Sequence, residues 1–235
     1  MSEIVTIITG TRKGIGEYLA KHYLELGHIV IGCSRTRPEW ESEYKNRYAH
    51  YLLDVADEAA VKRMFSDIRK KHSHVDNLIN NAGIAAMNHT ILTPVSVVDS
   101  VMNTNAKGTF IFSREAFKLM KRNKYGRIVN FATVATPLKL DGEAIYAASK
   151  AAIITLTQIM AKEFAGEGIT VNAIGPTPVQ TDLIKNVPAE KIHRLLNLQS
   201  IHRFGEFKDI ANVIDFYLNK ESDFITGQVI YLGGI

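Results

Sequence analysis

The chain has 235 residues, of which 46% are hydrophobic, so it is long and apolar enough to bury the core of one large domain. Its formal net charge is only +4, and no known binding module or set of interleaved aromatic residues accompanies its cations, so we expect no nucleic-acid surface. The nearest thing to a basic cluster falls at the expected end of a helix, where cations complement the helix dipole and stay solvated. This cluster consists of Lys118, Lys121, Arg122, Lys124 and Arg127.

The first residues lack the charged region, apolar run and cleavage site of a signal peptide, and no apolar run approaches the length of a transmembrane helix. The single cysteine, Cys33, lies in an apolar run and excludes a disulfide within the chain. We therefore expect a buried, inert thiol and a cytoplasmic protein that does not contact membranes.

Short apolar runs alternate with amphipathic, helix-length segments along the whole chain. Strands are predicted at residues 4–9, 28–34, 48–54, 75–80, 127–132, 169–174 and 228–232. Helices are predicted at residues 14–26, 58–72, 94–121, 143–165 and 208–219, the third with a bend near Gly108. The alternation predicts an α/β fold in which a doubly wound parallel sheet of about seven strands carries helices on both faces. No linker divides the chain, so we predict one domain spanning residues 1–235, with ligands bound beyond the carboxyl ends of the strands.

A glycine-rich loop follows the first predicted strand directly. Residues 9–16 read Thr-Gly-Thr-Arg-Lys-Gly-Ile-Gly and lead into the first predicted helix. Glycines permit a tight turn and a close approach of backbone amides to phosphate, at a helix N-terminus that favours anions. A plain turn between strand and helix is the alternative, but this is the structural context that a phosphate-binding loop requires.

A tyrosine and a lysine, Tyr146 and Lys150, lie four residues apart in an alanine-rich helical segment, so both side chains project from one face. A free phenol has a pKa near ~10, and a nearby ammonium favours its ionised form. Tyr146 is therefore a candidate to exchange a proton with a substrate oxygen. Many surface helices carry such a pair, so the weight of this pattern depends on the other motifs.

Four features resemble the short-chain dehydrogenase/reductase family in identity and order: the glycine loop, the run Asn80-Asn81-Ala82-Gly83, Asn105, and the pair Tyr146 and Lys150. The resemblance spans nearly the whole chain, and within the family the chain is most similar to the 3-oxoacyl-thioester (acyl-carrier-protein) reductase branch. It implies a Rossmann-type fold and a nicotinamide cofactor.

The resemblance assigns the glycines of the loop to the cofactor pyrophosphate, Asp54 to the adenine, and Asn81 with its neighbours to the adenosine ribose and to steadying the central strands. No metal site is implied. The full predicted cofactor site comprises Gly10, Arg12, Lys13, Gly14, Ile15, Gly16, Arg35, Asp54, Val55, Asn81, Ala82, Gly83, Tyr146, Lys150, Pro176, Thr177, Val179 and Thr181.

The end of the second strand predicts which dinucleotide binds. A site that prefers NAD usually has Asp or Glu there, whereas this chain has Ser-Arg-Thr-Arg at residues 34–37. A carboxylate would repel the 2′-phosphate of NADP, and Arg35, together with Arg12 or Lys13, is suited to bind it. We predict NADP(H) as the cofactor; the alternative is that these arginines are merely solvated on a loop.

In the family scheme Tyr146 gives its proton to the carbonyl during reduction, while Lys150 lowers the pKa of the tyrosine and binds the nicotinamide ribose. Asn105 would hold a water that connects the lysine to solvent; the alternative is an amide that bonds the backbone at a helix kink. The family serine thirteen residues before the tyrosine is Thr133 here. Threonine keeps the hydroxyl but adds a methyl group and stiffens the side chain.

A second departure is Pro176-Thr177, where the family usually has Pro-Gly in the loop that meets the nicotinamide carboxamide. A side chain followed by Pro178 narrows the accessible backbone angles, so we expect a stiffer or displaced contact. Thr181 matches the family position that reaches the carboxamide or phosphate. Residues 183–201 have helical periodicity and are predicted to form a mobile substrate lid, a permanently packed helix being the alternative.

The family commonly binds its acyl carrier protein with two arginines, whose matching positions are Lys124 and Glu167, so carrier-protein binding is disfavoured here. The expected substrate is a small-molecule ketone or an acyl thioester, and the resemblance implies a homotetramer or homodimer. The leading hypothesis is an NADPH-dependent carbonyl reductase. The alternatives are a catalytically weakened NADP-binding sensor or scaffold, and an oxidative alcohol dehydrogenase or lyase-like enzyme on the same fold.

Overall fold

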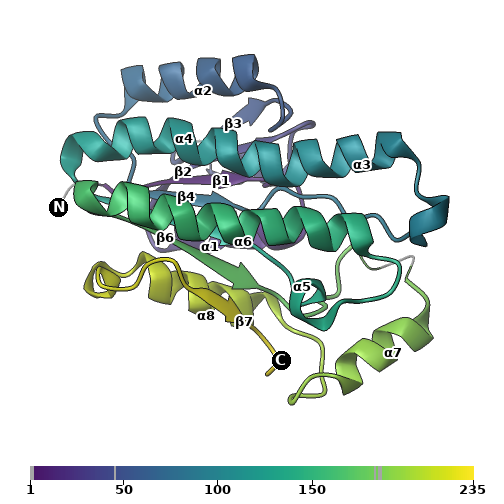
Figure 1. Cartoon of the computed structure of the whole chain (residues 1–235). Coiled ribbons are helices and arrows are strands. Elements are labelled where there is room, and N and C mark those ends of the chain that lie inside the picture. Colours follow the sequence, from purple (N-terminus) through teal and green to yellow (C-terminus); the bar gives the residue numbers. More distant parts are fainter. Residues whose placement is uncertain (1–2, 45, 183, 185–186) are drawn as a thin grey trace.

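The computed structural model describes residues 3–235 except residues 45, 183, 185 and 186. Its central feature is one seven-stranded sheet, parallel throughout, with the strand order β3-β2-β1-β4-β5-β6-β7 (Figure 1). The predicted fold class is confirmed. The strands are β1 (Val5–Thr9), β2 (Ile29–Ser34), β3 (Tyr48–Leu52), β4 (Asn77–Asn80), β5 (Gly126–Phe131), β6 (Ile169–Gly175) and β7 (Val229–Tyr231).

The seven predicted strands are all present, each with ends within two residues of the prediction. Strand β4 returns to pair with β1, so the direction of winding reverses between these two neighbours. In doubly wound sheets this reversal opens a crevice at the carboxyl ends of the strands, which is where ligands bind. The topology therefore puts the segments after β1 and β4 side by side.

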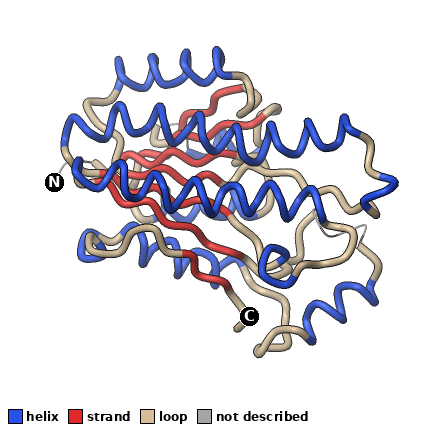
Figure 2. The backbone as a smooth tube through the Cα atoms, viewed as in Figure 1, coloured by secondary structure: helices blue, strands red, loops and turns tan. Residues whose placement is uncertain are grey.

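Helices cover both faces of the sheet, and the tube drawn in Figure 2 separates the two helical layers from the strands. Helices α2, α4 and α6 pack over one core cluster, which includes Met64 and Phe112, and α1 and α8 pack over the other, which includes Leu19 and Ile214. The helices are α1 (Ile15–Glu25), α2 (Glu58–Lys71), α3 (Val95–Met102), α4 (Gly108–Met120), α5 (Ala135–Leu138), α6 (Ala144–Phe164), α7 (Ala189–Asn197) and α8 (Phe207–Leu218). Short helical turns are η1 (Glu39–Tyr44), η2 (Thr90–Leu92), η4 (Lys121–Asn123), η5 (Ala165–Glu167) and η6 (Lys220–Ser222).

The third predicted helix is interrupted by a π-helical turn, η3 (Asn103–Lys107), between α3 and α4. Such turns arise where an extra residue enters the helical ladder, and they are common at functional sites. Here the turn presents the buried amide of Asn105 to the backbone of Ile84. The break thus lies directly before Gly108, whose missing side chain leaves room for Val55.

The basic cluster is solvated as expected, with one correction. Arg127 is only 2% exposed: it lies inside β5, stacks on Tyr125 at 4.5 Å, and donates to the carbonyl oxygens of Gly126 and Lys220. The sequence prediction was wrong here because an arginine at the start of a strand can point inward when backbone carbonyls accept its protons.

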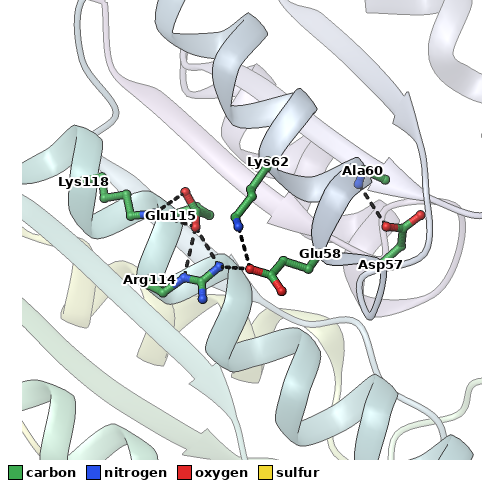
Figure 3. A network of polar contacts seen from close by, with 7 residues as sticks. All are labelled: Asp57, Glu58, Ala60, Lys62, Arg114, Glu115 and Lys118. Carbon is green, nitrogen blue, oxygen red and sulfur yellow. Dashed lines mark hydrogen bonds and ion pairs between the residues drawn. The ribbon is translucent and has the colours of Figure 1, made fainter.

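Helices α2 and α4 are joined by a network of ion pairs on the surface (Figure 3). The guanidinium of Arg114 bridges Glu58 on α2, at 2.8 Å, and Glu115 on its own helix. Hydrogen bonds from two cations lower the pKa of the Glu58 carboxyl group to about 2. The bond from Lys62 has the larger effect, and the bond from Arg114 has the next largest. The network therefore keeps α2 against α4 at the far side of the sheet from α1. Lys118 also binds Glu115, and Asp57, drawn beside the network in Figure 3, caps α2 by accepting from the N–H of Ala60.

One helical stretch among the described residues, Ala144–Glu167, is long and apolar enough to cross a membrane by length and composition, with a mean hydropathy of 1.3. A single such helix is weak evidence for a span, and this one packs against β6 in the α/β core. Cys33 is buried in β2, and burial raises the pKa of its thiol to about 12, which agrees with the predicted inert cysteine.

Candidate active site

A cavity of about 1490 Å³ opens at the carboxyl ends of the strands. Its wall is built by the segments that follow β1 to β6, together with α7 and the start of α6. Of the residues predicted to bind cofactor or to act in catalysis, all line this cavity except Asn105. The topology thus brings together positions that are spread over residues 10–181.

The glycine loop makes the tight turn that its sequence predicts. Gly10 and Gly14 adopt φ values of +78° and +64°, which side chains rarely tolerate. A side chain on Gly16 would collide with the carbonyl oxygen of Gly10. The loop therefore wraps closely onto the N-terminus of α1 and leaves a cradle without side chains, which fits the size and charge of a dinucleotide diphosphate.

The segment after β4 anchors this loop. The side-chain amide of Asn81 donates to the carbonyl oxygen of Thr9 at 2.9 Å, and the backbone N–H of Ala82 donates to the hydroxyl of Thr9 at the same distance. These bonds join the carboxyl ends of β1 and β4. The asparagine motif thus steadies the two central strands at the point where the winding reverses.

Three cations line the cavity from the glycine loop and from the loop after β2. Lys13 is paired with Asp182, which lies in the loop after β6 and also lines the cavity. Arg12 and Arg35 are exposed on the cavity wall, and among the described residues neither has a recorded hydrogen bond or ion pair. Arg12 and Arg35 therefore present guanidinium groups that are not committed to the protein, whereas Lys13 is engaged by Asp182. Nearby, Asp54 accepts from the backbone N–H of Ala56, as a strand cap does, and it also lines the cavity.

Tyr146 and Lys150 lie one turn apart on α6, with the ammonium nitrogen of Lys150 at 5.9 Å from the centre of the tyrosine ring. Lys150 is 4% exposed and donates to the backbone carbonyl of Phe131 at 2.7 Å. Burial lowers the pKa of Lys150 to about 8, because removing an ammonium from water disfavours its charged form. The lysine is thus held at the base of the cavity by the end of β5.

The pKa of Tyr146 corrects one expectation. Burial has the largest effect and raises this pKa to about 12, the hydrogen bond with Thr133 lowers it, and the charge of Glu143 raises it. The lowering by Lys150 that the sequence suggested is not among the causes of this pKa, and desolvation of the phenolate dominates it. Tyr146 is consequently a protonated acid at neutral pH.

Thr133 is close to the phenol. Its hydroxyl forms the hydrogen bond that lowers the pKa of Tyr146, and it also lies 3.3 Å from the donating N–H of Ala135. Only 7% of Thr133 is exposed, so its added methyl group is accommodated by the surrounding protein. The hydroxyl that replaces the family serine therefore faces the same cavity as the tyrosine.

Asn105 does not line the cavity but is connected to it by hydrogen bonds. Its amide accepts from the N–H of Ile84 and donates to the carbonyl of Ile84, both at 2.9 Å, and donates to Ser149 at 2.9 Å. Ser149 in turn donates to the backbone oxygen of Tyr146 at 2.7 Å. The side-chain amide is thus committed to protein groups, as in the helix-kink alternative, and it ties the π-helical turn to the helix that carries the tyrosine.

The loop after β6 is fixed by its unusual threonine. The side chain of Thr177 is 6% exposed, and its hydroxyl has no hydrogen-bond partner among the described residues. A methyl carbon added to Gly205 would come within 2.8 Å of the Thr177 methyl group, so the two segments are in close contact. The N–H of Gly205 also donates to Pro178 at 2.9 Å. The loop that the family uses for the nicotinamide carboxamide is therefore pinned to the segment before α8.

Three residues of the predicted lid, at positions 183, 185 and 186, lie outside the described residues. The remainder includes α7, none of whose residues is buried. Lys191, Ile192, Arg194 and Leu195 of α7 line the cavity, so this helix forms part of its wall, and the substrate lid stays a prediction.

Sequence reasoning missed Glu143, which precedes α6 and lines the cavity three residues before Tyr146. Burial raises the pKa of its carboxyl group, and the ammonium of Lys191 on α7 opposes that effect. Its position at the start of the tyrosine-bearing helix was the available signal. The carboxylate places a negative charge beside the reacting end.

A glycine cradle for a dinucleotide and a protonated tyrosine with a buried lysine share one cavity at the switch point of a doubly wound sheet. This combination defines a nicotinamide-dependent oxidoreductase acting on CH–OH and C=O groups. More closely, the chain belongs to the short chain dehydrogenase family, whose sequence model matches residues 4–192.

Two curated relatives cover almost the whole chain. The 3-oxoacyl-[acyl-carrier-protein] reductase FabG of Thermotoga maritima is 32% identical over 98% of this chain and 96% of its own length. The NADPH-dependent aldehyde reductase 2 of the Arabidopsis thaliana chloroplast is 33% identical over 98% of this chain and 92% of its own length. Both relatives are named as reductases.

Two solved structures have the same fold. ElxO with NADP bound is 31% identical, with a TM-score of 0.90 over 98% of this chain and 97% of its own. A short chain dehydrogenase of Leptospira borgpetersenii with bound NAD+ is 25% identical, with a TM-score of 0.90 over 99% of this chain and 92% of its own. A nicotinamide dinucleotide thus binds to this fold in both phosphorylated and unphosphorylated forms.

Proposed function

We propose that the protein is an NADPH-dependent carbonyl reductase that converts a ketone, with a 3-oxoacyl thioester as the leading candidate, into an alcohol. The observation that carries this proposal is the meeting of Tyr146, Thr133 and Lys150 with the glycine cradle in one cavity. The names of the curated relatives, which describe reductases of an oxoacyl thioester and of aldehydes, support the same reaction class.

The chemistry follows from the protonation states. A bound nicotinamide supplies the hydride. The hydroxyl of Thr133 and the phenol of Tyr146 polarise the substrate oxygen, and Tyr146 donates its proton to that oxygen. Since its pKa is raised to about 12, Tyr146 holds this proton throughout the neutral range. Lys150 then stabilises the phenolate that is left, because an ammonium nearby favours the ionised tyrosine.

The arginines beside β2 support NADPH over NADH. Arg12 and Arg35 present uncommitted guanidinium groups at the cavity wall, and residues 34–37 at the end of β2 include no carboxylate to repel a 2′-phosphate. The NADP-bound relative agrees with this choice, while the NAD+-bound one shows that the fold alone does not decide it. Matched calorimetric titrations with NADPH and NADH test the proposal, and tighter binding of NADH would refute it.

Cofactor oxidation measures the activity directly. NADPH consumption is followed against a panel of 3-oxoacyl thioesters, simple ketones and aldehydes. We expect turnover with one of these classes and a loss of about a hundredfold to ten-thousandfold in Tyr146→Phe, the range for removal of a general acid. Tyr125→Phe, which removes a remote phenol, is the matched control and should keep full activity.

The outcomes separate the competing functions. Consumption that Tyr146→Phe leaves unchanged contradicts the mechanism. Absence of consumption with every substrate, despite tight NADPH binding, favours the sensor or scaffold. Faster NADP reduction with the matching alcohols than NADPH oxidation with the ketones favours the oxidative dehydrogenase.

We propose that the acyl substrate is a coenzyme A thioester or another thioester that is not attached to a carrier protein. Of the two positions where the family branch has arginines, only Lys124 keeps a cation, and Glu167 reverses the charge. Acyl carrier proteins are acidic, so a carboxylate at the docking position opposes their approach. Parallel kinetics with coenzyme A and carrier-protein thioesters of one acyl chain test this, and a lower KM for the carrier form would contradict it.

We also propose a homo-oligomer assembled through the outer face of α4 and α6. Only 33% of the apolar window of α6 is buried within one chain, and Phe110 on α4 and Ile159 on α6 are 41% and 49% exposed. Exposed apolar faces of this kind are usually covered by another copy or partner. Light scattering at micromolar concentration should give a dimer or tetramer, and Ile159→Glu should shift it towards the monomer.

A further inference from the structure

Four side chains outside the catalytic centre form a continuous hydrogen-bonded chain beneath the end of the cavity next to β2. The hydroxyl of Thr11 lies 2.8 Å from the Tyr48 oxygen, and that oxygen lies 2.8 Å from Nδ1 of His50. Nε2 of His50 lies 3.1 Å from the hydroxyl of Ser34, which donates to the carbonyl of Thr36 at 2.6 Å. We call Thr11, Tyr48, His50 and Ser34 the relay. It runs from the glycine loop to the loop that follows β2.

The strands dictate this arrangement. Tyr48 and His50 are two residues apart on β3, so both project from one face of the sheet. Gly32 on β2 pairs with His50 in the sheet register. A side chain on Gly32 would collide with both the Tyr48 oxygen and the Thr11 hydroxyl, so the relay crosses β2 only because this residue is glycine. The Tyr48 ring is fixed in turn against Trp40, with ring centres 4.5 Å apart.

The relay has one consistent direction. The Thr36 carbonyl is an acceptor only, so Ser34 donates to it and must accept from Nε2–H of His50. Nδ1 of His50 is then an acceptor and takes the proton of Tyr48, whose oxygen accepts from Thr11. In this arrangement Tyr48, His50 and Ser34 each donate one hydrogen bond and accept one. Thr11, at the start of the relay, only donates. Burial also lowers the pKa of His50, which agrees with the neutral imidazole that this order requires.

The two ends of the relay carry the cations of the proposed cofactor site. Thr11 is followed by Arg12, and Ser34 by Arg35, and both arginines line the cavity. Tyr48 and His50 are not among the lining residues, so we expect no direct contact between them and a bound dinucleotide. Their effect on it can only pass through the two loops that they join.

We propose that His50 and Tyr48 are positioning residues that hold Arg12 and Arg35 at the spacing needed to bind the 2′-phosphate of NADP. This inference rests on the proposed NADPH preference. The relay fixes the two loops relative to each other before the dinucleotide binds, so less free energy is spent on ordering two flexible arginine-bearing loops. An unphosphorylated dinucleotide does not use the two arginines in this way and gains little from the relay.

The test compares dissociation constants for NADPH and NADH, measured by calorimetry without substrate. In Tyr48→Phe the ring stays on Trp40 but both relay bonds of the hydroxyl are lost. We expect its Kd for NADPH to rise about fivefold to tenfold, the loss for one misplaced charge-assisted contact, while the Kd for NADH stays within about twofold. Tyr44→Phe is the matched control: it removes a hydroxyl from the same aromatic cluster without touching the relay, and should bind both dinucleotides like the wild type.

A conservative pair of substitutions at His50 separates positioning from folding. His50→Gln keeps a side-chain N–H that can donate to Ser34 and should keep most of the preference for NADPH, whereas His50→Leu should lose it as Tyr48→Phe does. Equal losses for NADPH and NADH would show a general structural role and overturn the inference, as would an unchanged ratio in Tyr48→Phe. A wild-type protein that binds NADH more tightly would instead refute the proposed NADPH preference itself.

Discussion

The ammonium of Lys150 donates to the backbone carbonyl of Phe131 across 2.7 Å. The last residue of β5 thus holds the buried lysine that lies beside Tyr146. A single hydrogen bond does not offset the loss of water around an ammonium group. This imbalance is the cause of the lowered pKa of Lys150, and it leads to a measurable dependence of stability on pH.

For Lys150 the pKa is about 8 in the folded chain against 10.5 ordinarily. Between these values the unfolded chain binds the proton that the folded chain has released, so stability rises with pH. Below about 8 both states are protonated and the full penalty of burial remains. Relative to Lys150→Met, the wild type should therefore gain about 3 kcal/mol of unfolding free energy between pH 8 and pH 10.5. Denaturation of both proteins across this range measures the gain, and parallel curves would contradict it.

Substitutions at Thr133 test its hydroxyl. Thr133→Ser keeps the group beside Tyr146 and should preserve or raise kcat. Thr133→Val keeps the shape but removes the donor, and kcat should fall about a hundredfold to a thousandfold, as for loss of one donor to a developing oxyanion. Binding of NADPH without substrate should be equal in all three proteins. Equal turnover in the three would remove Thr133 from the mechanism.

The contact between Thr177 and Gly205 predicts a coupled pair of substitutions. A methyl group added by Gly205→Ala meets the Thr177 methyl at 2.8 Å, so this variant should lose about 1–3 kcal/mol of unfolding free energy through overpacking. Thr177→Ser removes that methyl and should restore most of the loss when both changes are combined. A double-mutant cycle by chemical denaturation measures the coupling, and simple additivity of the two effects would show that the contact is not tight.

The lowered pKa of His28 predicts that the folded chain is less stable in acid. It lies 2.9 Å from the Thr6 hydroxyl and stacks on Tyr23, and burial is the main cause of its lowered pKa, while Asp76 and Asp215 oppose the shift and His22 adds to it. As pH falls through 6.5 the unfolded chain binds a proton that the folded chain resists, so stability decreases.

The variant His28→Asn removes the titrating ring, and His202→Asn changes an exposed histidine as its control. Between about pH 7.5 and about pH 5.5 the urea midpoint should fall less in His28→Asn than in the wild type. The fall should be equal in His202→Asn and the wild type. A loss in His28→Asn as large as that of the wild type would assign the acid sensitivity to other groups.

The fold was largely predictable because each strand is a short apolar run bounded by turn residues, and local composition is enough to show it. The break in the third helix was predicted near Gly108 and lies directly before it, at Asn103–Lys107, but the hydrogen bonds of its Asn105 with Ile84, distant in the sequence, were not predictable. Arg127 was misjudged for a similar reason: the carbonyl of Lys220 that receives it is known only from the tertiary structure.

Most of the site was also predictable, since its residues follow strand ends and parallel strands bring such ends together. The quantities that depend on burial were not. The sequence suggested a tyrosine pKa lowered by Lys150, whereas desolvation raises the pKa of Tyr146 to about 12. The relay through His50 was also not predicted, although the sequence shows Tyr48 and His50 two residues apart on a strand that pairs with Gly32.

The pairing of Lys13 with Asp182 has a consequence for the chain during its synthesis. The two residues are 169 positions apart, so the glycine loop leaves the ribosome long before the loop after β6. A ligand stabilises a protein by binding the folded state and not the unfolded one. We therefore expect little stabilisation by a dinucleotide in a chain that ends before the loop after β6. Protection against proteolysis by the nucleotide should thus distinguish chains whose synthesis has passed the loop after β6.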